Sequence, residues 1–116
     1  MAATAITLQS IALDSDGVTV TKNAVTASDG DKFLNSNGRS FCIIENGSGS
    51  SINAVVSANQ TVSGAALTVP DLTVAVANGA AVLIGPFPTA TFNDSNNYVT
   101  VTCSDDTSVT IAALEY

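Results

Sequence analysis

The chain is built from short segments that favour β-strands, each followed within a few residues by a turn signal. Residues 98–104 (YVTVTCS) alternate between apolar and polar side chains, which is the pattern of a strand with one buried face. Turn signals recur about every 8–12 residues, and no segment shows the 3.6-residue period of a helix. This arrangement is typical of an all-β fold, an antiparallel β-sandwich or a jelly-roll-like small barrel.

We expect a single β domain over residues 1–116, with about eight strands, because the length suits one domain with one core. The predicted strands are residues 5–13, 40–46, 51–58, an edge strand within 59–71, 72–77, 80–85, 98–104 and 108–116. Residues 18–28 alternate only at first. Residues 29–39 are predicted to form a polar loop, with Phe33 and Leu34 pinning it to the core.

Three turn signals predict β-hairpins. GSGS at 47–50, Asn78–Gly79 and Asp105–Asp106 each separate two predicted strands by a short polar connection. Asn-Gly is the favoured sequence of a type I′ hairpin turn. The strands on either side of each turn are therefore expected to be hydrogen-bonded to each other.

Four apolar residues in the N-terminal segment 1–13 change parity midway, which predicts a bulge or bend near Gln9–Ser10. They are Ile6 and Leu8 on one face and Ile11 and Leu13 on the other. The segment is expected to be a first strand or an extended N-terminal arm.

The charge balance argues against two kinds of partner. Ten acidic residues stand against Lys22, Lys32 and Arg39, giving a net charge of −7. Nucleic acids and anionic membrane surfaces both need clustered cations, so we expect neither as a partner. The N-terminus lacks the basic and apolar regions of a signal peptide, and no apolar run is long enough for a transmembrane helix. We expect a chain made in the cytoplasm.

Catalytic patterns are missing from the sequence. The chain has no histidine, which removes Ser-His-Asp and Cys-His arrangements, and it has no phosphate-binding or dinucleotide-binding glycine motif. Cys42 and Cys103 lie in predicted strands and are expected to be buried thiols, with a disulfide as the alternative. We therefore expect no enzyme activity, no catalytic residue, no cofactor and no metal site. The alternative of a calcium ion bound between loops is left open by the sequence.

Residues 85–88 (GPFP) place one phenylalanine between two prolines. Gly85 permits an unusual backbone angle or a close approach. Pro86 and Pro88 stiffen an extended segment, so Phe87 is held in one direction. Its ring is either a plug at the end of the core or an anchor for a neighbouring protein.

The order of several short motifs resembles a family of small virion proteins of tailed bacteriophages. These motifs are NGRSFCIIENGS at 37–48, LIGPFP at 83–88, YVTVTCS at 98–104 and the closing SVTIAALEY at 108–116. The resemblance spans roughly residues 35–116, and its shared positions are Asn37, Gly38, Arg39, Asn46, Gly47 and Ile84–Pro88. It implies a head decoration, or cement, protein on the capsid exterior, with the major capsid protein as partner.

The resemblance also implies an assembly. Decoration proteins sit at symmetry axes, so a homo-oligomer is expected, a trimer rather than a dimer. The N-terminal segment is the candidate arm that clamps the capsid. The expected capsid or subunit interface comprises Ile6, Leu8, Ile11, Leu13, Arg39, Pro86, Phe87 and Pro88.

Two other functions stay open. A head–tail connector or tail component would differ from a decoration protein mainly in copy number per virion. A cell-surface or carbohydrate-binding β-sandwich module is the second. Such modules usually display aromatic platforms, whereas this chain has no tryptophan and only Tyr98 and Tyr116 as tyrosines.

Overall fold

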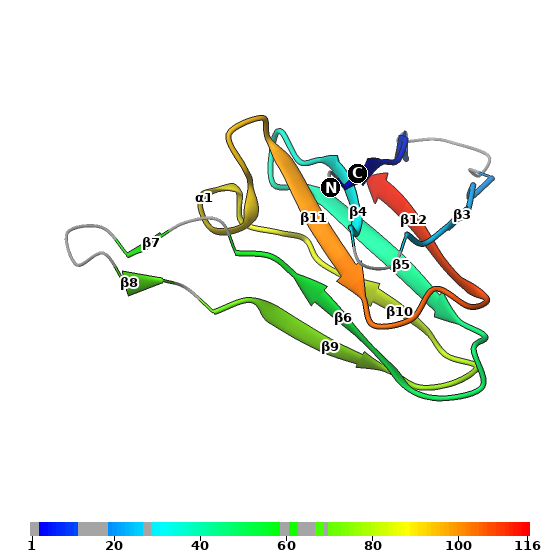
Figure 1. The fold of residues 1–116 in the computed structure, drawn as a ribbon. Helices are drawn as coiled ribbons and strands as arrows, with labels where there is room; N and C mark the ends of the chain where they lie inside the picture. The colour runs from blue at the N-terminus through cyan, green and yellow to red at the C-terminus, as the bar shows by residue number, and fades with distance from the viewer. Residues whose placement is uncertain (1–2, 12–18, 27–28, 59–60, 63–66, 69) are drawn as a thin grey trace.

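The computed structural model describes residues 3–11, 19–26, 29–58, 61–62, 67–68 and 70–116. Two β-sheets pack face to face as a sandwich (Figure 1), which confirms the predicted all-β fold class. The smallest extent of the molecule is 23 Å, as expected for two sheets about 10 Å apart with side chains on their outer faces.

The strands form two five-stranded sheets and one small separate sheet. Sheet A runs in the order β1 (Thr4–Ala5), β4 (Asp31–Leu34), β11 (Tyr98–Cys103), β6 (Ile52–Val56) and β9 (Leu72–Val76). Sheet B runs in the order β10 (Ala81–Ile84), β5 (Ser40–Asn46), β12 (Val109–Glu115) and β2 (Leu8–Ser10), and β3 (Asn23–Ala24) also pairs with β12. The separate sheet holds β7 (Thr61–Val62) and β8 (Leu67–Thr68), and α1 (Thr89–Phe92) is one helical turn.

The strands on either side of each predicted hairpin turn lie in opposite sheets, so the three predicted hairpins are wrong. β5 and β6, β9 and β10, and β11 and β12 are each joined by a short loop but share no hydrogen-bonded ladder. The turn after β9 is not type I′ either, because only Gly79 has a positive φ there. A turn sequence fixes where the chain reverses. It does not fix whether the next strand pairs beside its predecessor or packs across from it.

The centre of each sheet therefore pairs strands that are far apart in the sequence. β5 and β12 are antiparallel along their whole length, from Asn46 opposite Val109 to Ser40 opposite Glu115. In sheet A, β6 and β11 are also antiparallel and pair at three positions, from Val56 opposite Val101 to Ala54 opposite Cys103. The core lies between these two pairs.

The expected polar loop 29–39 contains a strand. β4 pairs with β11 and turns Phe33 fully into the core, whereas Leu34 on the opposite face is 41% exposed. Only Phe33 of the predicted apolar pair is therefore an anchor. A four-residue strand between two turn signals is too short to show a periodic pattern.

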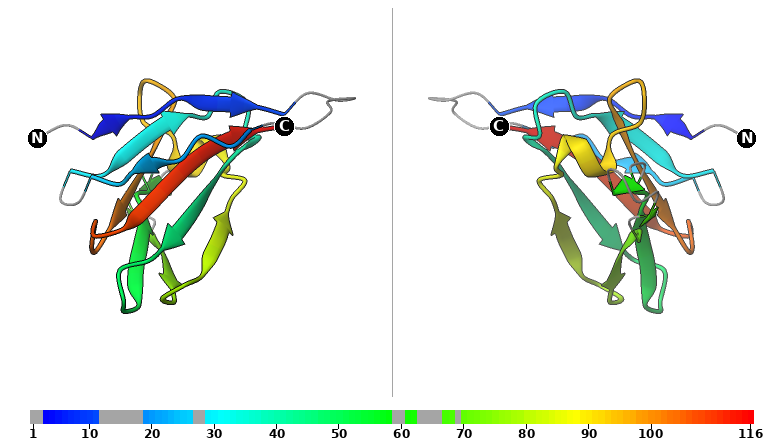
Figure 2. Two further views of the ribbon diagram at one scale, coloured as in Figure 1. Left: turned by 90° about the vertical axis from the view of Figure 1, so that its right-hand side faces the viewer. Right: turned by 90° about the vertical axis from the view of Figure 1, so that its left-hand side faces the viewer.

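The described part of the N-terminal segment is extended and lies against its own domain. β1 pairs in parallel with β4 of sheet A, and β2 pairs in parallel with β12 of sheet B. The segment thus bridges the two sheets along one side of the sandwich, as the blue strands in Figure 2 show. The break between its two strands falls at Ile6–Thr7, earlier than the predicted bend.

Side chains hold this bridge in place. Ile6 and Leu8 are half-buried and pack against the core. The Gln9 side-chain amide donates to the Thr21 carbonyl oxygen and accepts from the Thr21 N–H, both at 2.9 Å. Removing this segment would open one side of the sandwich.

The sequence left two roles for Phe87, a plug of the core or an anchor for a neighbouring protein, and the structure shows the plug. Its ring is 2% exposed and lies 5.9 Å from the Phe33 ring and 5.7 Å from the Phe92 ring, centre to centre. Gly85 lets the backbone before Phe87 pass close to Phe41. Its φ is +123°, and a Cβ at this position would lie 2.9 Å from Cβ of Phe41. The expectation of Phe87 as an interface residue is therefore wrong, because the ring points inward.

A buried pair of asparagines ties the plug to the sheets. The Asn35 amide donates to the Phe87 carbonyl oxygen at 3.0 Å and to Oδ1 of Asn93 at 2.8 Å. The Asn93 amide in turn donates to the Asn35 carbonyl oxygen at 2.7 Å. The end of β4, the GPFP segment and the end of α1 are thereby joined in one network, which fixes the direction of the ring.

The two cysteines are buried free thiols, as expected from the sequence. Burial, and secondarily the neighbouring Cys103, raises the pKa of Cys42 to about 12. Burial, and secondarily Asp31, raises the pKa of Cys103 to about 11. Both side chains are protonated at neutral pH and act as small apolar residues of the core.

Asp31 is a buried carboxyl group at the edge of the same core. Its Oδ2 accepts a hydrogen bond from the Thr26 N–H at 2.9 Å. Burial raises its pKa above the ordinary value of 3.8, although the hydrogen bond from Thr26 acts in the opposite direction. Desolvation therefore outweighs the hydrogen bond at this position.

Phe87→Ala is expected to lower the free energy of unfolding by about 3–5 kcal/mol, because it removes a buried ring and leaves a cavity. Urea denaturation followed by circular dichroism measures the loss. Leu34→Ala is the matched control, and its exposed side chain predicts a loss below about 1 kcal/mol. Losses of equal size in the two variants would contradict the plug role of Phe87.

Asp31→Asn is expected to change how stability depends on pH. The folded carboxyl has a higher pKa than the unfolded one, so the folded state binds more protons in the interval between the two values. Its contribution to stability is present below the unfolded pKa and is lost as pH rises through the folded pKa. Urea denaturation between about pH 4 and pH 8 should therefore show the variant gaining on the wild type as pH rises. A difference that stays constant with pH would contradict this reading.

Candidate interaction surface

The outer face of sheet B carries a row of apolar side chains. In β5, Cys42 and Ile44 turn into the core, which leaves Phe41 and Ile43 on the outer face, half-buried. In β10, Leu83 lies opposite Ile43 and is 58% exposed. Apolar side chains therefore continue across the two neighbouring strands on the outside of the molecule.

An aromatic pair extends this row at one end of the sheet. The Phe41 and Tyr116 ring centres are 6.3 Å apart, and the Arg39 guanidinium lies 5.0 Å from the centre of the Tyr116 ring. The Tyr116 N–H donates to the Arg39 carbonyl oxygen at 3.4 Å. We call Phe41, Ile43, Leu83 and Tyr116 together the apolar face.

The structure brings together only some of the residues expected at an interface. Arg39 borders the apolar face, and Ile11, which is 40% exposed, donates its N–H to the Glu115 carbonyl oxygen near the same end of β12. Pro86 follows Gly85, whose backbone lies against Phe41.

The other expected interface residues lie elsewhere. Ile6 and Leu8 pack against the core of their own domain, and Phe87 is buried. Pro88 is exposed and caps α1, where its carbonyl oxygen accepts from the Phe92 N–H at 3.1 Å. Leu13 lies outside the described residues.

The apolar face itself was missed from the sequence, although a signal for it exists. The strand 40–46 (SFCIIEN) carries apolar side chains at both parities. Such a strand is either covered on both faces or exposes an apolar surface on one. The outer parity of this strand, Phe41 and Ile43, was thus a usable indication.

Each of the three cations has a local partner. Lys22 forms an ion pair with Glu45, with Nζ 2.8 Å from the carboxylate. The Lys32 ammonium lies 4.8 Å from the centre of the Tyr98 ring, and Arg39 lies over Tyr116. Because cation–π contacts leave the charge in place, Arg39 adds a positive rim to the apolar face.

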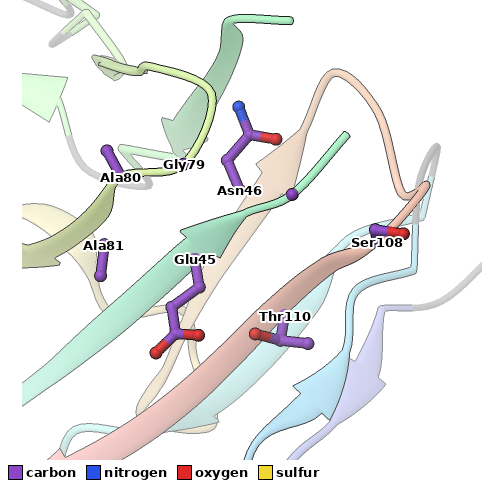
Figure 3. A pocket seen from close by; sticks show the side chains of 8 residues that line it. Glu45, Asn46, Gly79, Ala80, Ala81, Ser108 and Thr110 are labelled. Carbon is purple, nitrogen blue, oxygen red and sulfur yellow. The ribbon is translucent and has the colours of Figure 1, made fainter. Parts of the chain in front are cut away.

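A shallow hollow of about 240 Å³ lies at the opposite end of sheet B (Figure 3). Its lining includes Glu45, Asn46 and Thr110, and Figure 3 shows Glu45 and Thr110 on the sheet face with Asn46 turned the other way. Glu45 is occupied by Lys22. The Asn46 amide donates to the Ser50 and Val76 carbonyl oxygens at 2.7 and 3.0 Å. The hollow therefore lies where β5, β10 and β12 meet their adjoining turns, and Glu45 and Asn46 in its lining are already engaged.

Neither a metal cluster nor a membrane helix is present in the described part of the chain. No group of three or more Cys, Asp or Glu side chains there could hold a metal ion. No helix there is long and apolar enough to cross a membrane.

Comparison with known proteins gave no match: no family model, no curated protein and no solved structure matches this chain. The side chains themselves therefore define what the surface can do. An apolar face with aromatic residues and an arginine at its rim suits contact with another protein.

Proposed function

We propose that this protein is a structural component of a tailed-bacteriophage virion. It is a decoration, or cement, protein that binds the outer surface of the capsid and stabilises it, with the major capsid protein as its partner. Its place is the capsid exterior, after synthesis in the host cytoplasm. The apolar face on one side of a rigid sandwich is the observation that carries this proposal.

The placement of the family-like motifs supports the proposal. The NGR segment and the GPFP segment are far apart in the sequence, yet a Cβ on Gly38 would lie 3.6 Å from the Phe87 carbonyl oxygen. Arg39 then projects over Tyr116 beside Phe41. Two of the motifs that carry the resemblance thus meet at one end of the apolar face.

The chemistry of the face suits capsid docking. Tyrosine, phenylalanine and arginine are enriched at protein interfaces, and the rigid aromatic rings bury a large area at a small entropic cost. A decoration protein repeats its contact many times over the shell. Contacts of modest individual affinity then act together, and the combined affinity exceeds that of any one site.

The capsid contact is assigned to the apolar face of sheet B instead of the N-terminal segment. Residues 3–11 already bridge the two sheets, and Ile6 and Leu8 fill part of the core. A clamp made from them would have to leave these positions first. The apolar face needs no rearrangement to meet a partner.

Quantitative mass spectrometry of purified virions tests this function. The ratio of this chain to the major capsid protein is expected to be near one, or a simple fraction of one, because a decoration protein covers the whole head. A handful of copies would indicate a connector or tail component. Absence from the particle would favour a surface module.

The docking face is tested by binding purified protein to capsids that lack it. Tyr116→Ala is expected to weaken binding at least about tenfold, because buried tyrosines are frequent hot spots. Leu34→Ala, an exposed apolar residue on sheet A, is the control and should bind like the wild type. Equal binding by all three proteins would contradict the assignment of the face.

A further inference from the structure

Charged residues avoid one side of the sandwich. The chain has ten acidic and three basic residues, yet residues 46–93 contain only Asp71. This stretch supplies β6, β9 and β10. β9 and β10 are the terminal strands of sheets A and B and follow each other through a short turn, and neither strand carries a charged residue.

The two sides of the sandwich differ in whether their edge strands are covered. On one side, β1 covers the edge of β4, while β2 and β3 cover the edge of β12. On the other side, β9 and β10 each have a neighbouring strand on one flank only, within the described residues. Figure 2 shows β10, in yellow-green, at the outer edge of sheet B beyond β5. Natural edges are usually blunted by charges, prolines or bulges, and β10 (AVLI) contains no charge and no proline.

The hydrogen-bond pattern of β5 shows which groups of β10 face outward. The Asn46 N–H donates to the Ala80 carbonyl oxygen, and the Gly47 N–H donates to the Ser108 carbonyl oxygen. Antiparallel bonding alternates, so Val82 and Ile84 direct their backbone groups toward β5. The N–H and C=O groups of Ala81 and Leu83 consequently point away from the sheet.

We propose that two copies of this protein pair along β10, antiparallel about a two-fold axis at Val82. In this register Ala81 lies opposite Leu83 of the second copy, and their outward N–H and C=O groups bond reciprocally. The large Leu83 side chain covers the small Ala81 of the second copy on the outer face. The two B sheets become one continuous sheet, and the two apolar faces lie side by side.

The distribution of charge favours a second copy of this chain as the partner of the β10 edge. Close to a two-fold axis a charged residue lies near its own counterpart, so a chain of net charge −7 can self-associate most easily where the strand at the axis carries no charge. β10 meets this condition, and Glu45, which lies opposite Ala81, is neutralised by Lys22. A cationic partner would instead select the acidic parts of the surface. The β9 edge begins next to Asp71 and is less suitable.

This pairing does not rest on the proposed capsid function, and it replaces the trimer that the resemblance implies with a dimer. An antiparallel pair of identical strands is closed, because each copy uses its only β10 edge. A cyclic trimer would need two different surfaces on each copy.

Analytical ultracentrifugation of the full chain tests the pairing. The wild type is expected to sediment as a dimer and Leu83→Lys as a folded monomer. A lysine at this exposed position leaves the fold of the single chain intact, whereas its charge disfavours the pairing of two β10 edges. Leu34→Lys is the matched control, with the same charge change on an exposed leucine of sheet A, and should remain dimeric. A wild-type monomer, a trimer, a dimeric Leu83→Lys or a monomeric Leu34→Lys would overturn the proposal.

Mixed cysteine variants test the register. Ala81→Cys and Leu83→Cys proteins, mixed in equal amounts and mildly oxidised, should form a disulfide-linked dimer, because opposed residues lie about 5.5 Å apart at Cα. Each variant alone should cross-link far less, because identical residues are offset along the strands beyond about 7 Å. Cross-linking that is absent from the mixture, or equally strong in a single variant, would overturn the register.

Discussion

The sandwich depends on hydrogen-bonded pairing between strands that are remote in the sequence. β5 pairs with β12 over its full length, and β6 pairs with β11, while the loops between β5 and β6 and between β11 and β12 cross from one sheet to the other. Each of these crossings therefore joins one strand of sheet A to one strand of sheet B and couples the two sheets. Asn46, buried where one crossing begins, secures it by donating to the carbonyl oxygens of Ser50, in the crossing loop, and of Val76, at the end of β9.

This topology leaves two unequal sides, and the charges follow the same division. The N-terminal strands complete the side formed by β4 and β12, whereas residues 46–93, which supply β9 and β10, contain Asp71 as their only charged residue. Strands β9 and β10 themselves carry no charged residue, and within the described residues each has one unpaired edge. Next to the β10 edge, Phe41, Ile43 and Leu83 extend across the outer face of sheet B toward Tyr116. A pairing along β10 would thus join two apolar faces into one larger surface, which would present a capsid with twice the contact area.

The local pattern of the sequence predicted strands well and their partners poorly. Residues 40–46 and 98–104 were placed almost to the residue, because alternation reflects the burial of one face. The predicted strand partners were wrong because Asn78–Gly79 and the other two turn sequences specify that the chain reverses. They do not specify in which sheet the next strand lies. Strand β4, the parallel pairing of β1 with β4 and the parallel pairing of β2 with β12 were missed. Each depends on a partner strand elsewhere in the chain, which the local pattern does not show. For Phe87, the two prolines indicated a fixed direction, but only the surroundings of the ring decide that it points inward.

Amide hydrogen exchange measured by NMR at low and high protein concentration tests most directly whether the open edge is where this protein meets a second copy. The Val82 and Ile84 amides are expected to be protected at both concentrations, because they bond to β5. The Ala81 and Leu83 amides should exchange rapidly when dilute and become protected when concentrated. Exchange of Ala81 and Leu83 that is independent of concentration would contradict the account.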